Sequence, residues 1–285
     1  MTPPPAGILR AGTRSFAWGG GTVPHLMAIL NVTPDSFSDG GLYTDHAAAI
    51  AHGERCAAEG AAIIDVGGES TRPGAARVPA AEQLARTGPV VRALAVRHAV
   101  SIDTTSSEVA AAAIAAGACI VNDVSAAAED PAIVEAAAAG GAALVLMHRR
   151  FAPGEDRWST EHDPRRPEGD VVAEVRDWLA ARVDAVVRAG MPRDRVAIDP
   201  GLGFGKSVAE NVALLERVGE LSALGLPVLV GASRKSFLGA LAGEPDPSMR
   251  DRASVHAALV AARGGAAILR VHAVEAHARA LGCRA

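Results

Sequence analysis

Polar side chains that could bind or activate a substrate follow most of the short apolar runs of this sequence. In chain order they are Asn31, Asp65, Asp103, Asn122, His148, Asp199, Ser233, Lys235, Arg270 and His272. If the runs are parallel strands of a barrel, their carboxyl ends share one face, and these groups converge on one pocket. An Asp or Asn after a strand is also a common N-cap of the following helix, so each position alone is ambiguous. The whole series favours a binding or catalytic site.

Three glycine-bearing segments follow apolar runs and suit close approach of the backbone to a ligand. They are residues 31–41 (NVTPDSFSDGG), 67–74 (GGESTRPG) and 201–207 (GLGFGKS). The last resembles a phosphate-binding Walker A loop, but Pro200 stands where that motif requires its first glycine. A Walker nucleotide site is therefore excluded.

The elements that would position these groups alternate in type along the chain. Eight short apolar runs occur, most of them followed by an Ala-rich segment of helical character, at 26–32, 62–66, 99–102, 119–121, 143–147, 196–198, 227–230 and 267–271. Alternating strands and helices predict a parallel sheet, and eight units favour closure into a single (β/α)₈ TIM barrel of α/β class. An open doubly wound sheet is the alternative.

The boundaries of several elements can be predicted from local signals. We expect helices over 80–98, 130–139 and 170–189, with Gly88-Pro89 as a point where the first could kink or split. Residues 1–25 form a short N-terminal extension, with a possible hairpin closing the barrel floor, and 26–285 form the barrel. The irregular segment 149–169 is interpreted as a mobile lid or as an inert insertion.

Composition excludes several classes of protein. The net charge is −4 with no basic stripe, which argues against nucleic-acid binding. No uncharged apolar span is long enough for a membrane helix. Cys56, Cys119 and Cys283 have neither metal-ligand spacing nor a disulfide pattern. A soluble cytoplasmic protein is the expectation.

The motifs at the ends of the apolar runs resemble, in order, those of dihydropteroate synthases. The matching segments are 31–41 (NVTPDSFSDGG), 65–74 (DVGGESTRPG), 101–104 (SIDT), 122–125 (NDVS), 199–206 (DPGLGFGK), 231–235 (GASRK) and 270–274 (RVHAV). The resemblance implies a pterin-binding barrel that condenses 6-hydroxymethyl-7,8-dihydropterin diphosphate with p-aminobenzoate in folate biosynthesis. It also implies a homodimer and sensitivity to sulfonamides.

The same resemblance implies roles for individual residues. The pterin pocket would contain Asp65, Asp103, Asn122, Met147, Asp199 and Lys235, of which Asp103, Asp199 and Lys235 are the catalytic candidates. The diphosphate would be held by Asn31, Arg72, Arg270 and His272, with Asn31 also a ligand of Mg²⁺. The p-aminobenzoate site would contain Thr71, Pro73, Phe204, Ser233 and Lys235. Met147 is equally consistent with plain barrel core.

Two departures from the family pattern keep other functions open. Ala273 replaces the aspartate of the last motif, which removes either an N-cap or a carboxylate that orients the phosphate ligands. Ala126-Ala127 stands where glycines are frequent, and because alanine disfavours positive φ we expect a different loop path beside Asn122. A pterin-dependent methyltransferase and a non-catalytic pterin-binding paralogue are the alternative functions.

Overall fold

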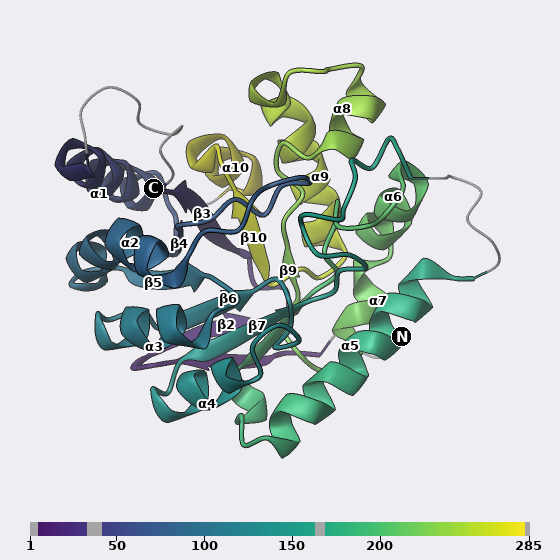
Figure 1. The fold of residues 1–285 in the computed structure, drawn as a ribbon. Helices are drawn as coiled ribbons and strands as arrows, with labels where there is room; N and C mark the ends of the chain where they lie inside the picture. The colour runs from purple at the N-terminus through teal and green to yellow at the C-terminus, as the bar shows by residue number, and fades with distance from the viewer. Residues whose placement is uncertain (1–4, 33–41, 163–168, 283–285) are drawn as a thin grey trace.

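A computed structural model describes residues 5–32, 42–162 and 169–282 of the chain. The segment 33–41, which holds most of the first glycine-bearing motif, lies outside the described residues. Figure 1 shows strands in the centre of the molecule with helices around them. The central sheet positions the candidate site, and a ring of helices surrounds it.

Within the described residues, eight parallel strands form the central sheet. They are β3 (His25–Asn31), β4 (Ile63–Gly67), β5 (Ala99–Asp103), β6 (Ile120–Asp123), β7 (Ala143–Met147), β8 (Val196–Asp199), β9 (Leu229–Val230) and β10 (Ile268–Val271). Each strand coincides with one of the eight apolar runs. Nearly every strand residue is buried, as expected for a parallel sheet covered on both faces.

The sheet closes on itself between β8 and β9. Its strand order is β8-β7-β6-β5-β4-β3-β10-β9, and a parallel bridge joins Ile198 to Val228 across the remaining gap. There the Ile198 backbone N–H donates to the Pro227 carbonyl at 3.0 Å, a normal length for a hydrogen bond between strands. The prediction of a TIM barrel is confirmed, and the open-sheet alternative is wrong.

Helices follow the strands and pack on the outside of the barrel. They are α1 (Leu42–Ala58), α2 (Ala80–Ala95), α3 (Ser107–Ala115), α4 (Ala132–Ala139), α5 (Val171–Arg188), α6 (Val208–Glu216), α7 (Val218–Ser222), α8 (Ser236–Ala242), α9 (Asp251–Arg263) and α10 (Val274–Leu281). Pro89 lies inside α2 without splitting it. Helix α5 begins where its sequence predicts, because the Asp170 side chain accepts a hydrogen bond from the Val172 N–H.

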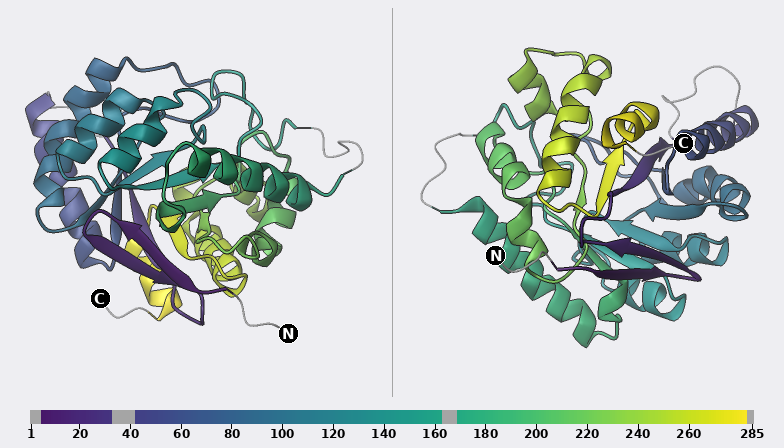
Figure 2. Two further views of the ribbon diagram at one scale, coloured as in Figure 1. Left: turned by 90° about the horizontal axis from the view of Figure 1, so that it is seen from below. Right: turned by 180° about the vertical axis from the view of Figure 1, so that it is seen from behind.

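An antiparallel hairpin of β1 (Gly7–Ala11) and β2 (Arg14–Trp18) covers the amino-terminal end of the barrel. Figure 2 shows it lying across that end of the strands. Its apolar face packs in one cluster with residues at the start of the strands, among them Met27, Ile63 and Ala143. The hairpin therefore seals the end of the barrel opposite the candidate site.

The segment after β7 is anchored over the described part of its length. The Asp156 carboxylate accepts the Gly205 N–H at 2.9 Å, and Asn211 on α6 donates to the Ser159 hydroxyl at 3.2 Å. Both Asp156 and Ser159 are buried. The described part of this segment is therefore tied to the loop after β8 and to α6.

Candidate functional site

An arginine links two buried carboxylates at the carboxyl end of the barrel. Arg270, on β10, donates from Nε to Asp65 Oδ2 at 2.6 Å and from Nη2 to Asp103 Oδ2 at 2.7 Å. Asn122, on β6, donates to the same Asp65 oxygen at 3.1 Å. The guanidinium fork fits two carboxylates at once, so four strands contribute to one polar cluster.

Gly67, at the end of β4, leaves space beside this cluster because it has no side chain. A Cβ there would lie 3.5 Å from Asn31 Oδ1 and 3.6 Å from Asp103 Cβ. The Asn31 side chain and Asp103 therefore flank the same point. Asp65 is fully buried, and its Oδ1 has no hydrogen-bond partner among the described residues. A buried carboxylate oxygen without a donor is costly unless a ligand supplies one.

A second group of candidates lies at the ends of β8 and β9. The Lys235 ammonium is 4.6 Å from the centre of the Phe204 ring and donates to the Leu202 carbonyl. Asp199 accepts the Gly201 N–H at 2.6 Å. A Cβ on Gly231 would meet Arg270 Cβ at 3.7 Å and Lys235 Nζ at 4.0 Å, so this group adjoins the arginine cluster.

His272 and Ser233 form a third, adjoining pair. The Ser233 hydroxyl accepts the His272 backbone N–H at 3.2 Å and lies 2.9 Å from Nδ1 of its ring. Because the hydroxyl oxygen already accepts, its own proton can go to Nδ1, which favours the tautomer protonated at Nε2. Burial lowers the pKa of His272 to about 3, and the charges of Arg234 and Arg270 act in the same direction. His272 is therefore a neutral donor at physiological pH.

Burial also shifts the acids and the lysine of the site. It raises the pKa of Asp103 to about 7, although the charge of Arg270 opposes this effect. It raises the pKa of Asp199 as well, against the opposing charge of Lys235. It lowers the pKa of Lys235 to about 8, with Asp199 acting in the opposite direction. Such displaced pKa values cluster at functional sites.

Comparisons with known proteins agree with this arrangement. Residues 27–272 match the model of the pterin binding enzyme family. The chain belongs to the pterin-binding enzyme family. It is 43% identical to the dihydropteroate synthase of Synechocystis, over 97% of this chain and 93% of that protein.

Solved structures of the family superpose on the whole barrel. A Xanthomonas albilineans dihydropteroate synthase with 4-aminobenzoic acid has a TM-score of 0.85 and 44% identity, covering 97% of both chains. The same enzyme in complex with 7,8-dihydropteroate has a TM-score of 0.82 and 43% identity, covering 96% of both. The resemblance inferred from the motifs is confirmed.

The remaining family candidates lie around these groups. Thr71 lines a small cavity together with Asp103, whereas Pro73 lies partly buried in the same loop. Arg72 is exposed, and its positive charge contributes to lowering the pKa of His272. Met147 is buried at the end of β7, where its Cγ would lie 3.2 Å from a Cβ on Gly201. Met147 thus lies against the start of the 201–205 turn.

The fourth loop contradicts one expectation. Ala126 and Ala127 adopt φ of 52° and 59°, so the alanines take the left-handed conformation that they were expected to avoid. The buried Asp123 carboxylate accepts the Ser125 and Ala127 N–H groups at 2.7 and 2.6 Å, and Arg182 donates to the Ala126 carbonyl. These bonds offset a conformational cost of about 1–2 kcal/mol per residue.

Ala273 occupies the N-cap position of α10 without a side-chain cap. The Asp missing from the motif would therefore stand at the start of this helix. The backbone carbonyl of Ala273 is already engaged, because His277 Nδ1 lies 2.6 Å from its oxygen. The position fits the N-cap interpretation.

Lys206 was overlooked in the sequence. Its side chain is fully buried, and its ammonium donates to the carbonyls of Gly201 at 2.9 Å, Phe204 at 3.0 Å and His148 at 3.3 Å. It thereby holds the turn that carries Phe204 and joins it to the end of β7. Its position in the Gly-Lys-Ser sequence was a signal, but only for the rejected Walker motif.

Arg234 was also overlooked, although it stands between Ser233 and Lys235. Its φ is 60°, and its guanidinium forms a two-point ion pair with Asp251 at 2.6 and 2.8 Å. Its N–H donates to Ser254 Oγ at 2.9 Å. Helix α9 therefore fixes the backbone that presents the two neighbouring side chains.

Proposed function

We propose that the chain condenses 6-hydroxymethyl-7,8-dihydropterin diphosphate with p-aminobenzoate, which yields 7,8-dihydropteroate and diphosphate. The observation that carries this proposal is the Arg270 fork between Asp65 and Asp103, next to Asn122, in a chain of the pterin-binding enzyme family. The relatives named dihydropteroate synthases support the reaction, and the cluster supports its location.

The pterin would bind against Asp65, Asp103, Asn122 and Asp199. A pterin edge presents ring N–H, amino and carbonyl groups, which carboxylates and an amide can match in alternation. Asp65 Oδ1 offers an unused acceptor for one of these donors. Lys235 would contact the ring from the side of Phe204, and Met147 would back the turn beneath it.

The diphosphate would be held by Arg72, Arg270, His272 and Asn31. Arginine forks suit phosphate oxygens, and neutral His272 would donate from Nε2. Among the described residues, no group of three or more His, Cys, Asp or Glu could hold a metal ion. The Asn31 amide oxygen fits Mg²⁺, because Mg²⁺ takes most of its ligands from substrate phosphates and water. The ion would neutralise charge on the leaving group.

The p-aminobenzoate would lie between Phe204 and the loop that carries Thr71 and Pro73. The ring can pack on Phe204, and its carboxylate can bind Ser233 or Lys235. Because sulfonamides have the same shape, we propose that they compete at this site. The solved relative with 4-aminobenzoic acid supports the choice of this substrate class.

The reaction would be a substitution at the exocyclic methylene carbon of the pterin. The carbon–oxygen bond to diphosphate breaks, the arylamine nitrogen forms the new bond and then loses a proton. The carboxylates would stabilise positive charge on the pterin, and Arg270 and His272 the leaving diphosphate. No side-chain nucleophile is required, so catalysis rests on positioning and electrostatics.

The test is diphosphate release from the pterin diphosphate, with and without p-aminobenzoate and with Mg²⁺ present or chelated. Release that requires both supports the synthase. Pterin binding by calorimetry without release would favour a non-catalytic paralogue, and methyl transfer from a methylated folate would favour a methyltransferase.

We further propose a cytoplasmic homodimer, to be tested by sedimentation and fractionation. None of the described helices has the length and apolarity needed to cross a membrane.

A further inference from the structure

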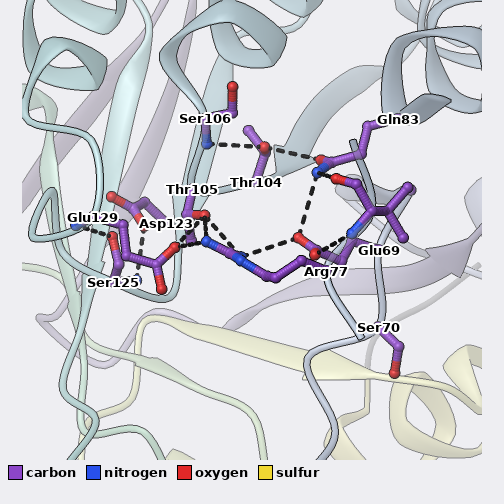
Figure 3. A network of polar contacts seen from close by, with 12 residues as sticks. Glu69, Ser70, Arg77, Gln83, Thr104, Thr105, Ser106, Asp123, Ser125 and Glu129 are labelled. Carbon is purple, nitrogen blue, oxygen red and sulfur yellow. Dashed lines mark hydrogen bonds and ion pairs between the residues drawn. The ribbon is translucent and has the colours of Figure 1, made fainter. Parts of the chain in front are cut away.

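The β4–α2 loop (residues 68–79) carries Thr71, Arg72 and Pro73, and the N–H of the next residue, Gly74, donates to the Pro153 carbonyl at 2.9 Å. The cavity that Thr71 shares with Asp103 is also lined by Glu69, Arg77 and Thr105. The walls of the candidate p-aminobenzoate site therefore depend on how this loop is fastened to the barrel. Figure 3 shows the polar network that fastens it.

Arg77 stands at the centre of this network. Its Nη1 atom lies 3.2 Å from Glu69 Oε2, and both terminal nitrogens donate to the Thr105 hydroxyl at 3.3 and 3.2 Å. Nη2 also pairs with Glu129 Oε2, which in turn accepts the Thr105 hydroxyl at 2.8 Å. One guanidinium thus connects loops that follow β4, β5 and β6.

Both carboxylates have further hydrogen-bond or ion-pair partners that hold them in place. Glu69 accepts the Val78 N–H at 2.8 Å and the Gln83 amide at 3.4 Å, and its side chain is only 8% exposed. Glu129 also pairs with Arg149, which follows β7. Burial opposes ionisation of Glu129, but the hydrogen bonds from Arg149 and Thr105 lower its pKa. Glu129 is therefore a fixed anion to which the loop can be tied.

We propose that Arg77 is a positioning residue that latches the β4–α2 loop to Glu129 and Thr105 and so shapes the site for the arylamine substrate. This inference rests on the proposed synthase function. The latch acts through the loop, because the Arg77 guanidinium is engaged by Glu69, Thr105 and Glu129 while Thr71, farther along the loop, lines the cavity. Arg77 is 56% exposed, so salt can screen the latch.

Steady-state kinetics of Arg77→Gln test the role in substrate binding. We expect KM for p-aminobenzoate to rise about fivefold, the scale of a lost charged network. Both kcat and KM for the pterin diphosphate should stay within about twofold. For Arg77→Lys we expect a KM for p-aminobenzoate between those of wild type and Arg77→Gln, because one ammonium cannot reach all three partners. Arg92→Gln, an equal charge change at an exposed position on α2, is the matched control. Equal changes in KM for both substrates, or a fall in kcat alone, would overturn the proposal.

A double-mutant cycle with Glu129→Gln isolates the ion pair. If the latch exists, Arg77→Gln and Glu129→Gln together should raise KM for p-aminobenzoate no further than the larger single effect. Independent, multiplied effects would show that the two residues do not act together.

Hydrogen exchange separates this inference from the function on which it rests. In the substrate-free protein, the peptide covering residues 68–79 should exchange faster in Arg77→Gln than in wild type or Arg92→Gln. Unchanged exchange would refute the latch even in an active enzyme. Faster exchange in a protein that releases no diphosphate would retain the latch and refute the synthase.

Discussion

Arg270 Nε lies 2.6 Å from Asp65 Oδ2, although the two residues are 205 positions apart. The contact joins the last strand of the barrel to its second, and it is possible because β10 pairs with β3, which lies beside β4. It also places a permanent cation beside a fully buried carboxylate. Removal of Arg270 leaves an uncompensated buried charge on Asp65.

Arg270→Lys should therefore be severe although it keeps the charge. A single ammonium cannot bridge Asp65 and Asp103 in two directions, so one carboxylate loses its partner. We expect a loss of about 3 kcal/mol in unfolding free energy, in the range for a broken buried ion pair, and pterin binding below detection. Urea denaturation and calorimetry measure both. Retained pterin affinity in a folded variant would contradict the proposed pocket.

Pterin affinity should depend on pH through Asp103. Its pKa is raised to about 7, mainly by burial, so the empty site takes up a proton as the pH falls below 7. A pterin that donates to this carboxylate must displace that proton, and affinity should fall up to about tenfold per pH unit. Asp103→Asn should weaken binding and flatten this part of the profile. An unchanged slope would assign the pH dependence to another group, such as Asp199.

Ala273→Asp and Ala273→Asn separate the two interpretations of the missing carboxylate. Both side chains can cap α10 and should stabilise the protein by about 1 kcal/mol, or about 2–4 °C in Tm. If the carboxylate also orients Arg270 or His272, only Ala273→Asp should raise kcat. Equal stability gains without a change in turnover would show that the position is an N-cap only.

Stability should rise with pH through Lys206. Burial lowers its pKa to about 7, with the charge of Arg150 acting in the same direction. Between about pH 7 and pH 10 the unfolded chain then binds more protons at this lysine than the folded protein. The free energy of unfolding contributed by this group therefore increases over that window. Lys206→Met should reduce this slope in denaturation curves measured from pH 7 to 10, and an unaltered slope would contradict the assignment.

Much of the barrel was predictable because each strand is a short apolar run bounded by polar residues. The same regularity places Asp65, Asp103 and Asn122 on one face. Other features depend on contacts between distant segments and leave no local pattern. Arg77 and Glu129 are 52 residues apart, and neither stands out in its own neighbourhood. The positive φ of Ala126 was wrongly excluded, because propensity ignores the bonds made there by Asp123 and Arg182.

Lys206 and Lys235 are the two lysines of the sequence, and all its other side-chain cations at neutral pH are arginines. Lys206 is buried and Lys235 is half-buried at the mouth of the barrel, so both ε-amino groups of the folded protein lie at this one end of the molecule. An NMR spectrum of the protein labelled isotopically at lysine would therefore contain one signal from each of these two residues. One comes from Lys206, which holds the turn that carries Phe204, and the other comes from Lys235, a candidate substrate contact. Reagents that modify lysine amines would report the accessibility of the same two side chains. This end of the molecule can therefore be observed without an engineered tag.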